Sequence, residues 1–200
     1  MRLNFKKDSL LVTAMLVAAG CSDSMTEENN PEQQVPIAFG TQVVTRAVVE
    51  SDKEGMDNFT LWGWVRESDG PKLFFDAASV TPSGNYGEKR FWAVGRPYDF
   101  FAVHPEKMEE DGAATEVSCN DKGELRVTGF DSSGMGKDAV DLMTATKPDV
   151  TYEGGGTMPP VLLAFEHELA QVKLTVRTGE KLAEVSDIRL FGVDYKGDLL

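Results

Sequence analysis

The segment NFTLWGWV, residues 58–65, carries the pattern that decides the fold class of this chain. It combines aromatic and β-branched side chains in a short run, and the turn-forming residues RESDGP follow it directly. Such a run is typical of a β-strand, in which successive side chains point to opposite faces of the sheet. One face would hold Phe59, Leu61 and Val65, and the other Thr60, Trp62, Trp64 and Arg66.

Runs of the same kind recur along residues 35–165, separated by turn residues such as glycine, proline, asparagine and aspartate. Helical periodicity is almost absent from this region. Short strands divided in this way predict an all-β sandwich, a fold that takes about 100 residues and seven strands. The 131 residues from 35 to 165 are therefore expected to form one sandwich domain. The runs are VPIAF (35–39), KLFF (72–75), KRFWAV (89–94), YDFFAV (98–103), ELRVTGF (124–130) and VLLAF (161–165).

Residues 1–20 have the features of a lipoprotein signal peptide. A basic start, Met1–Lys7, precedes the mainly apolar run Leu10–Ala19, which is shorter than the roughly 20 residues of a transmembrane helix. The end of this run leads through Gly20 directly into Cys21 and resembles the bacterial lipobox. In a lipobox the cysteine sulfur takes a diacylglycerol and the chain is cut just before it. We therefore predict cleavage between Gly20 and Cys21 and a lipid anchor at Cys21.

Residues 21–34, CSDSMTEENNPEQQ, are polar and acidic and lack the apolar periodicity of a packed segment. We interpret them as a disordered acidic tether. Residues 1–20 contain three of the 20 basic and one of the 33 acidic residues, so the chain after them holds 17 basic residues against 32 acidic ones. Nucleic-acid binding depends on basic side chains that neutralise phosphates. No nucleic-acid partner is expected.

Motifs for catalysis or metal binding are missing from the sequence. His104 and His167 lie 63 positions apart, and neither an HExxH pattern nor a pair of closely spaced cysteines is present. Cys119 has no histidine near it in sequence, so we interpret it as a structural thiol rather than a nucleophile. We expect no metal, no cofactor and no enzymatic activity.

Three tryptophans, Trp62, Trp64 and Trp92, have two interpretations. On the surface of a sheet they would form a platform on which sugar rings stack. In strands this rich in aromatic residues they more often fill the core. The sequence alone leaves both interpretations open.

After the lipobox and the tether, a series of segments follows in the order Ile37-x-Phe39, TRA (45–47), FTLWGWV (59–65), RFWAVGRPYDFFAVHP (90–105), DLMTAT (141–146) and PPVLLAFEHELAQVKLTV (159–176). In this order and spacing they resemble the fimbrillin family of surface lipoproteins of Gram-negative anaerobes. The resemblance covers essentially the whole chain, and the last two segments are its most specific parts.

The resemblance implies a non-catalytic subunit of surface fimbriae, or a fimbria-associated lipoprotein, with transthyretin-like β-sandwich domains. It implies export to the outer membrane, cleavage by an arginine-specific protease and addition of a strand from one subunit to the sheet of the next. Such fimbriae support adhesion to host or bacterial surfaces. Arg46, followed by Ala47, matches the position of the cleavage site, although it would simply end a strand in a member that keeps its lipid.

A different class of function competes with this one. A surface glycan-binding lipoprotein of a polysaccharide-uptake system would share the lipid anchor, the acidic composition and the β-sandwich. It would use the tryptophans as its stacking surface.

Residues 166–200 contain QVKLTVR (171–177), the cleanest alternation in the chain, with Val172, Leu174 and Val176 on one face. Two or three strands cannot close a second core by themselves. By the resemblance, residues 166–200 are the opening strands of an unfinished second sandwich, in a chain that is a fragment of a longer subunit. The alternative is that they fold back and complete the first sandwich.

Overall fold

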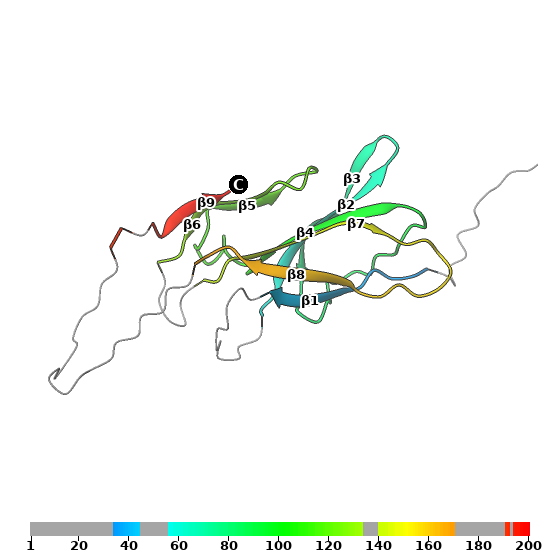
Figure 1. Ribbon diagram of the computed structural model, residues 1–200, viewed down its shortest axis with the longest axis horizontal. Helices are drawn as coiled ribbons and strands as arrows, with labels where there is room; N and C mark the ends of the chain where they lie inside the picture. Colours follow the sequence, from blue (N-terminus) through cyan, green and yellow to red (C-terminus); the bar gives the residue numbers. More distant parts are fainter. Residues whose placement is uncertain (1–33, 45–55, 134–139, 171–190, 193) are drawn as a thin grey trace, which may run out of the picture. The chain divides into compact units, whose positions relative to one another are not determined.

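The computed structural model describes residues 34–44, 56–133, 140–170, 191–192 and 194–200, all within one compact unit, residues 32–200. Regular structure in these ranges is β-strand throughout (Figure 1). They contain no helix long and apolar enough to cross a membrane. The prediction of an all-β fold is confirmed, whereas its transthyretin-like detail stays a prediction.

The strands form two sheets. The larger has six strands in the order β1-β8-β7-β4-β2-β3, and the smaller has three in the order β5-β6-β9. All neighbouring strands are antiparallel except β1 and β8, which are parallel. The strands are β1 (Phe39–Val44), β2 (Phe59–Glu67), β3 (Gly70–Val80), β4 (Pro97–His104), β5 (Glu116–Cys119), β6 (Leu125–Asp131), β7 (Met143–Thr151), β8 (Val161–His167) and β9 (Lys196–Leu199).

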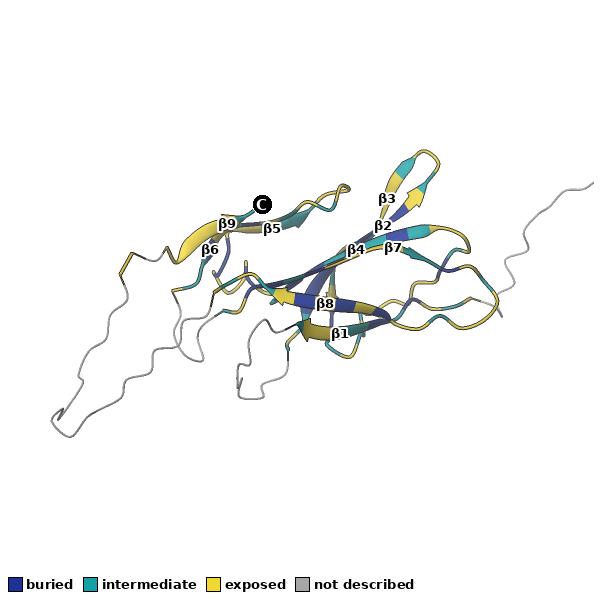
Figure 2. Ribbon diagram, viewed as in Figure 1, coloured by how far each residue is buried: buried dark blue, intermediate teal, exposed yellow. Residues whose placement is uncertain are grey.

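β2 is the strand predicted from NFTLWGWV, and both of its faces are buried. Phe59, Leu61 and Val65 belong to one hydrophobic cluster, which also receives side chains from β1, β3, β4, β7 and β8. Trp62 and Trp64 belong to a second cluster on the opposite face, where Val127 and Phe130 of β6 meet them. β2 therefore lies between two different cores, one on each face, and its buried residues are dark blue in Figure 2.

Two predicted runs differ from the observed strands. Of VPIAF only Phe39 lies in a strand, at the start of β1, and KRFWAV is not a strand. Residues 89–94, KRFWAV, make only isolated bridges, Pro36 to Phe91 and Val94 to Tyr152. They belong to a longer connection, residues 81–96, which we call the crossing segment. Gly87 and Gly95 in this segment have positive φ angles of 83° and 70°, a conformation that interrupts a strand. The aromatic residues in KRFWAV thus lie in a loop that covers the core.

β7 was not predicted, because its sequence MTATKPDVT contains a proline and few large apolar side chains. A bulge accommodates this sequence: Tyr98 pairs with Val150, yet Phe100 pairs with Lys147. Asp149 in the bulge has a φ of 59°, and its N–H donates to Asp99 Oδ1 at 2.9 Å. Arg66 forms ion pairs with both Asp99 and Asp149 and so ties the bulge to β2.

Of residues 166–200, the structure describes 166–170, 191–192 and 194–200. β9 pairs with β6 in the smaller sheet, and Lys196 Nζ lies 2.9 Å from Asp131 Oδ2. Lys196–Leu199 thus form an edge strand of the smaller sheet. β8 continues past 165 to His167. QVKLTVR lies outside the described residues, so a domain boundary at 166 stays a prediction.

Candidate functional site

The first strand of the larger sheet lies at its edge. β1 runs parallel to β8 and pairs with it from Phe39↔Val161 to Val44↔Glu166 (Figure 1). The other neighbour of β8 in the sheet is β7, and that ladder is limited to Met143↔His167 and Thr144↔Glu166. Most of the strand pairing of β8 therefore depends on β1. Arg46 and Ala47 follow β1 in sequence by two and three residues and lie outside the described residues.

β1 and the residues before it insert two side chains into the core of the larger sheet. Ile37 and Phe39 are 2% and 4% exposed. The Phe39 ring packs edge to face against three other rings, with centroid distances of 5.6 Å to Phe75, 5.6 Å to Tyr86 and 5.2 Å to Phe100. The space that Phe39 fills is therefore walled by aromatic rings from β3, β4 and the crossing segment.

The crossing segment holds the chain just before β1 through main-chain hydrogen bonds. Ile37 N–H donates to Arg90 O at 2.8 Å, and Trp92 N–H donates to Val35 O at 3.0 Å. The Tyr86 hydroxyl donates to Ile37 O at 2.7 Å. Residues 35–37 are thus held by the crossing segment, and residues 39–44 by β8.

Gly84 of the crossing segment lies against the backbone of β1. A Cβ atom at this position would lie 2.2 Å from Phe39 O, and the φ angle of Gly84 is +85°. Only glycine combines this close approach with this conformation without strain. The contact brings the two segments together at the residue whose side chain fills the aromatic core.

The three tryptophans lie in the core. Trp62, Trp64 and Trp92 are 4%, 5% and 7% exposed. The smaller sheet covers Trp62 and Trp64, and Trp92 packs edge to face on Tyr98 at a centroid distance of 4.9 Å. In this arrangement they present no surface on which a sugar could stack, so the glycan-binding alternative lacks the feature on which it depended.

Sequence reasoning missed a small polar cluster. His104 and His167 both contact Asp141: His104 Nδ1 lies 3.3 Å from the main-chain oxygen, and His167 Nδ1 lies 2.9 Å from the carboxylate. No local motif connects these residues, because strand pairing through Met143 brings them together. Within the described ranges, no group of three or more histidine, cysteine, aspartate or glutamate side chains is placed to hold a metal ion.

The remaining predicted residues add no reactive group. Gly20 and Cys21 lie outside the described residues. Cys119, at the end of β5, is partly buried, and this burial raises the pKa of its thiol to about 12. A thiol that stays protonated at neutral pH is a poor nucleophile, so Cys119 fits the structural interpretation.

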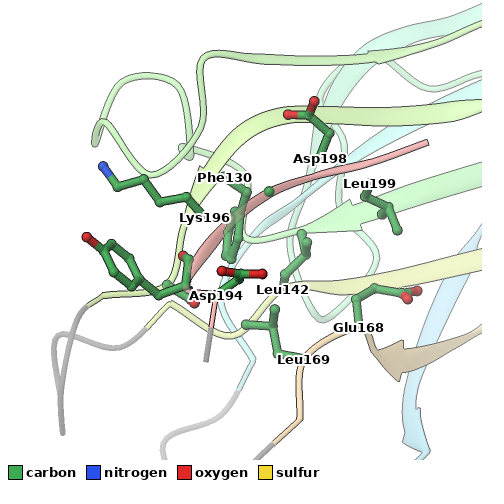
Figure 3. Close-up of a pocket in the computed structure, with 11 residues that line it drawn as sticks. Phe130, Leu142, Glu168, Leu169, Asp194, Lys196, Asp198 and Leu199 are labelled. Carbon is green, nitrogen blue, oxygen red and sulfur yellow. Dashed lines mark hydrogen bonds between the residues drawn. The ribbon is translucent and has the colours of Figure 1, made fainter. Parts of the chain in front are cut away.

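A cavity of about 190 Å³ lies between β9 and the end of β8 (Figure 3). Phe130, Leu142, Leu169 and Leu199 give it apolar walls, and Glu168 and Asp194 contribute carboxylates. Neither a histidine nor a cysteine is among the described residues that line it.

Comparisons with known proteins give two matches. The sequence pattern of a family described as fimbrillin-like matches residues 45–199. A curated relative, the fimbrium subunit Fim1C of Phocaeicola vulgatus, is 27% identical over 219 aligned residues, covering 96% of this chain and 56% of the relative. The chain thus spans little more than half the length of that protein. No solved structure matches at a significant level.

Proposed function

The chain belongs to the fimbrillin-like family, and from this membership we propose that it acts as a non-catalytic subunit of a cell-surface fimbria. The name of the relative, a fimbrium subunit, supports the same role. In this proposal the chain is exported to the outer membrane by lipid attachment at Cys21. Processing after Arg46 then prepares it to join other subunits by strand addition and to support adhesion.

The position and pairing of β1 support the assembly step. β1 ends two residues before Arg46, lies at the edge of the larger sheet and supplies most of the pairing of β8. Cleavage after Arg46 would therefore separate an entire edge strand from the rest of the chain. Its loss would leave an unpaired β8 edge above a groove walled by Phe75, Tyr86 and Phe100.

Removal of β1 would cost a large amount of folding free energy. This cost favours binding of another strand in place of β1. Burial of Ile37 and Phe39 contributes about 3–6 kcal/mol at about 1.5–3 kcal/mol for each large apolar side chain. That is a large part of the 5–15 kcal/mol by which a typical domain is stable. A strand from another subunit would restore both the main-chain pairing and the buried side chains, which is the chemistry of strand addition.

Limited digestion tests the proposal. We expect an arginine-specific protease to convert the native protein to a form that begins at Ala47, and the variant Arg46→Lys to resist this cut. The cleaved protein should unfold at a lower temperature once β1 is separated. A synthetic peptide of residues 35–44 should raise the unfolding temperature again, and the same peptide with Phe39→Ala should restore less of it.

Two results would contradict the proposal. Cleavage confined to other sites would remove the role of Arg46. Cleaved protein that keeps its original unfolding temperature after the released segment is removed would show that β1 does not support the sheet.

A further inference from the structure

The two ring nitrogens of the buried His104 imidazole differ: one has a hydrogen-bond partner among the described residues and the other does not. The residue is 8% exposed, and its Nδ1 lies 3.3 Å from Asp141 O. A carbonyl oxygen only accepts, so Nδ1 carries the proton and donates to it. Nε2 is buried, and none of the residues that the structure describes offers it a hydrogen-bond partner. This arrangement suits the neutral imidazole, whose Nε2 lone pair needs no acceptor.

Asp141 connects His104 to the end of β8. Its carboxylate accepts from His167 Nδ1 at 2.9 Å, while its main-chain oxygen accepts from His104. Next to it, Glu168 N–H donates to Leu142 O at 2.9 Å, and the Thr144 hydroxyl donates to the Glu168 carboxylate. We call residues 141–144 and 167–168 the junction. It joins the start of β7 to the end of β4 and to the end of β8.

We propose that His104 is an acid-sensitive latch for this junction. Protonation at Nε2 would place a charged N–H in a buried position where the described residues offer no acceptor, which is costly unless the group reaches water. Movement of residues 141–144 away from the end of β4 would give the imidazolium that access. Acid therefore opens the junction and loosens the end of β8, where the chain leaves the larger sheet.

The charges around His104 act in both directions. Burial of the imidazole is the largest effect and lowers its pKa. The hydrogen bond to Asp141 O and the carboxylates of Asp141 and Asp57 oppose this, and the charge of His167 adds to it. Together these effects place the pKa of His104 below its ordinary value. When the junction is open, the pKa of His104 is about 6.5. The open form therefore takes up a proton at pH values at which the closed form stays neutral. The closed junction is therefore stable above pH 6.5 and weakens as the pH falls below it.

Hydrogen exchange of the intact chain tests the latch. The Glu168 amide, bonded to Leu142 O, reports on the junction, and amides in the middle of β2 serve as an internal reference. After correction for intrinsic exchange, we expect the protection of Glu168 relative to β2 to fall between pH 7.5 and pH 5.5, by at most about tenfold for an open-form pKa of about 6.5. His104→Phe should abolish this pH dependence, whereas the matched variant His167→Gln, from the same cluster, should keep it.

The proposal is overturned if His104→Phe retains the full pH dependence, or if His167→Gln removes it. Titration of the His104 ring by NMR in the unaltered chain gives a second test that needs no variant. A midpoint below 6.5 that coincides with the loss of Glu168 protection supports the latch. A midpoint near 6.5 with unchanged protection contradicts it.

Discussion

Phe39 and Gly84 illustrate how single residues fix the position of an edge strand. The Phe39 side chain fills a space between three aromatic rings, and its carbonyl oxygen faces a glycine that leaves room for it. The sequence shows an aromatic residue in an Ile-x-Phe pattern, but it does not show which glycine lies opposite. That pairing depends on a contact between residues 45 positions apart.

The contact between Gly84 and β1 predicts a difference between two glycine variants. Gly84→Ala combines a positive φ with a Cβ 2.2 Å from Phe39 O. Gly87→Ala has a φ of +83°, and its Cβ meets no atom of the described residues within 4 Å. Both variants should lose about 1 kcal/mol from backbone strain. Gly84→Ala should lose about 1–3 kcal/mol more, measured by urea unfolding. Equal losses in the two variants would mean that β1 adjusts to the added methyl group.

At the scale of elements, β2 shows what alternation in a sequence can and cannot predict. The two faces proposed for residues 58–65 are the two faces observed, because the side-chain period of a strand is a local property. Whether the tryptophan face met solvent or another sheet could not be predicted. It is covered by β6, which follows β2 by about sixty residues and is placed by tertiary packing.

Because both faces of β2 are buried, we predict that its tryptophans stabilise the folded state. Trp62→Ala should lower the free energy of unfolding by about 3–5 kcal/mol, because it leaves a large cavity in the core between the sheets. The control Leu73→Ala, in β3 with a side chain that is 51% exposed, should change it by about 0.5 kcal/mol or less. Chemical denaturation measures both. A Trp62→Ala protein as stable as the control would mean that this core is not formed.

At the scale of the whole molecule, the proposed export and assembly rest on two positions that precede the folded core. Cys21 would attach the chain to the membrane through buried acyl chains, each methylene contributing about 0.8 kcal/mol. Cleavage after Arg46 would release the rest of the chain from the anchor and separate it from β1. Anchoring and assembly are thus alternative states of one N-terminal segment in this proposal.

Lipid attachment is tested with the two cysteines of the chain. Cys21→Ser should abolish labelling with radioactive palmitate and move the protein out of the membrane fraction. Cys119→Ser is the matched control and should keep both the label and the membrane association, since this partly buried thiol at the end of β5 lies far from the signal in sequence. Unchanged labelling of Cys21→Ser would refute the anchor.

The sequence by itself determined the all-β class, the strands with strong apolar alternation and the resemblance to fimbrillins. These properties are encoded in consecutive residues, through side-chain alternation and turn residues. Only the tertiary structure decided that β1 lies parallel to β8, that β9 returns to β6 and that His104 meets His167 through Asp141. Each of these contacts joins segments distant in sequence. Their formation depends on how the two cores pack, which no local pattern records.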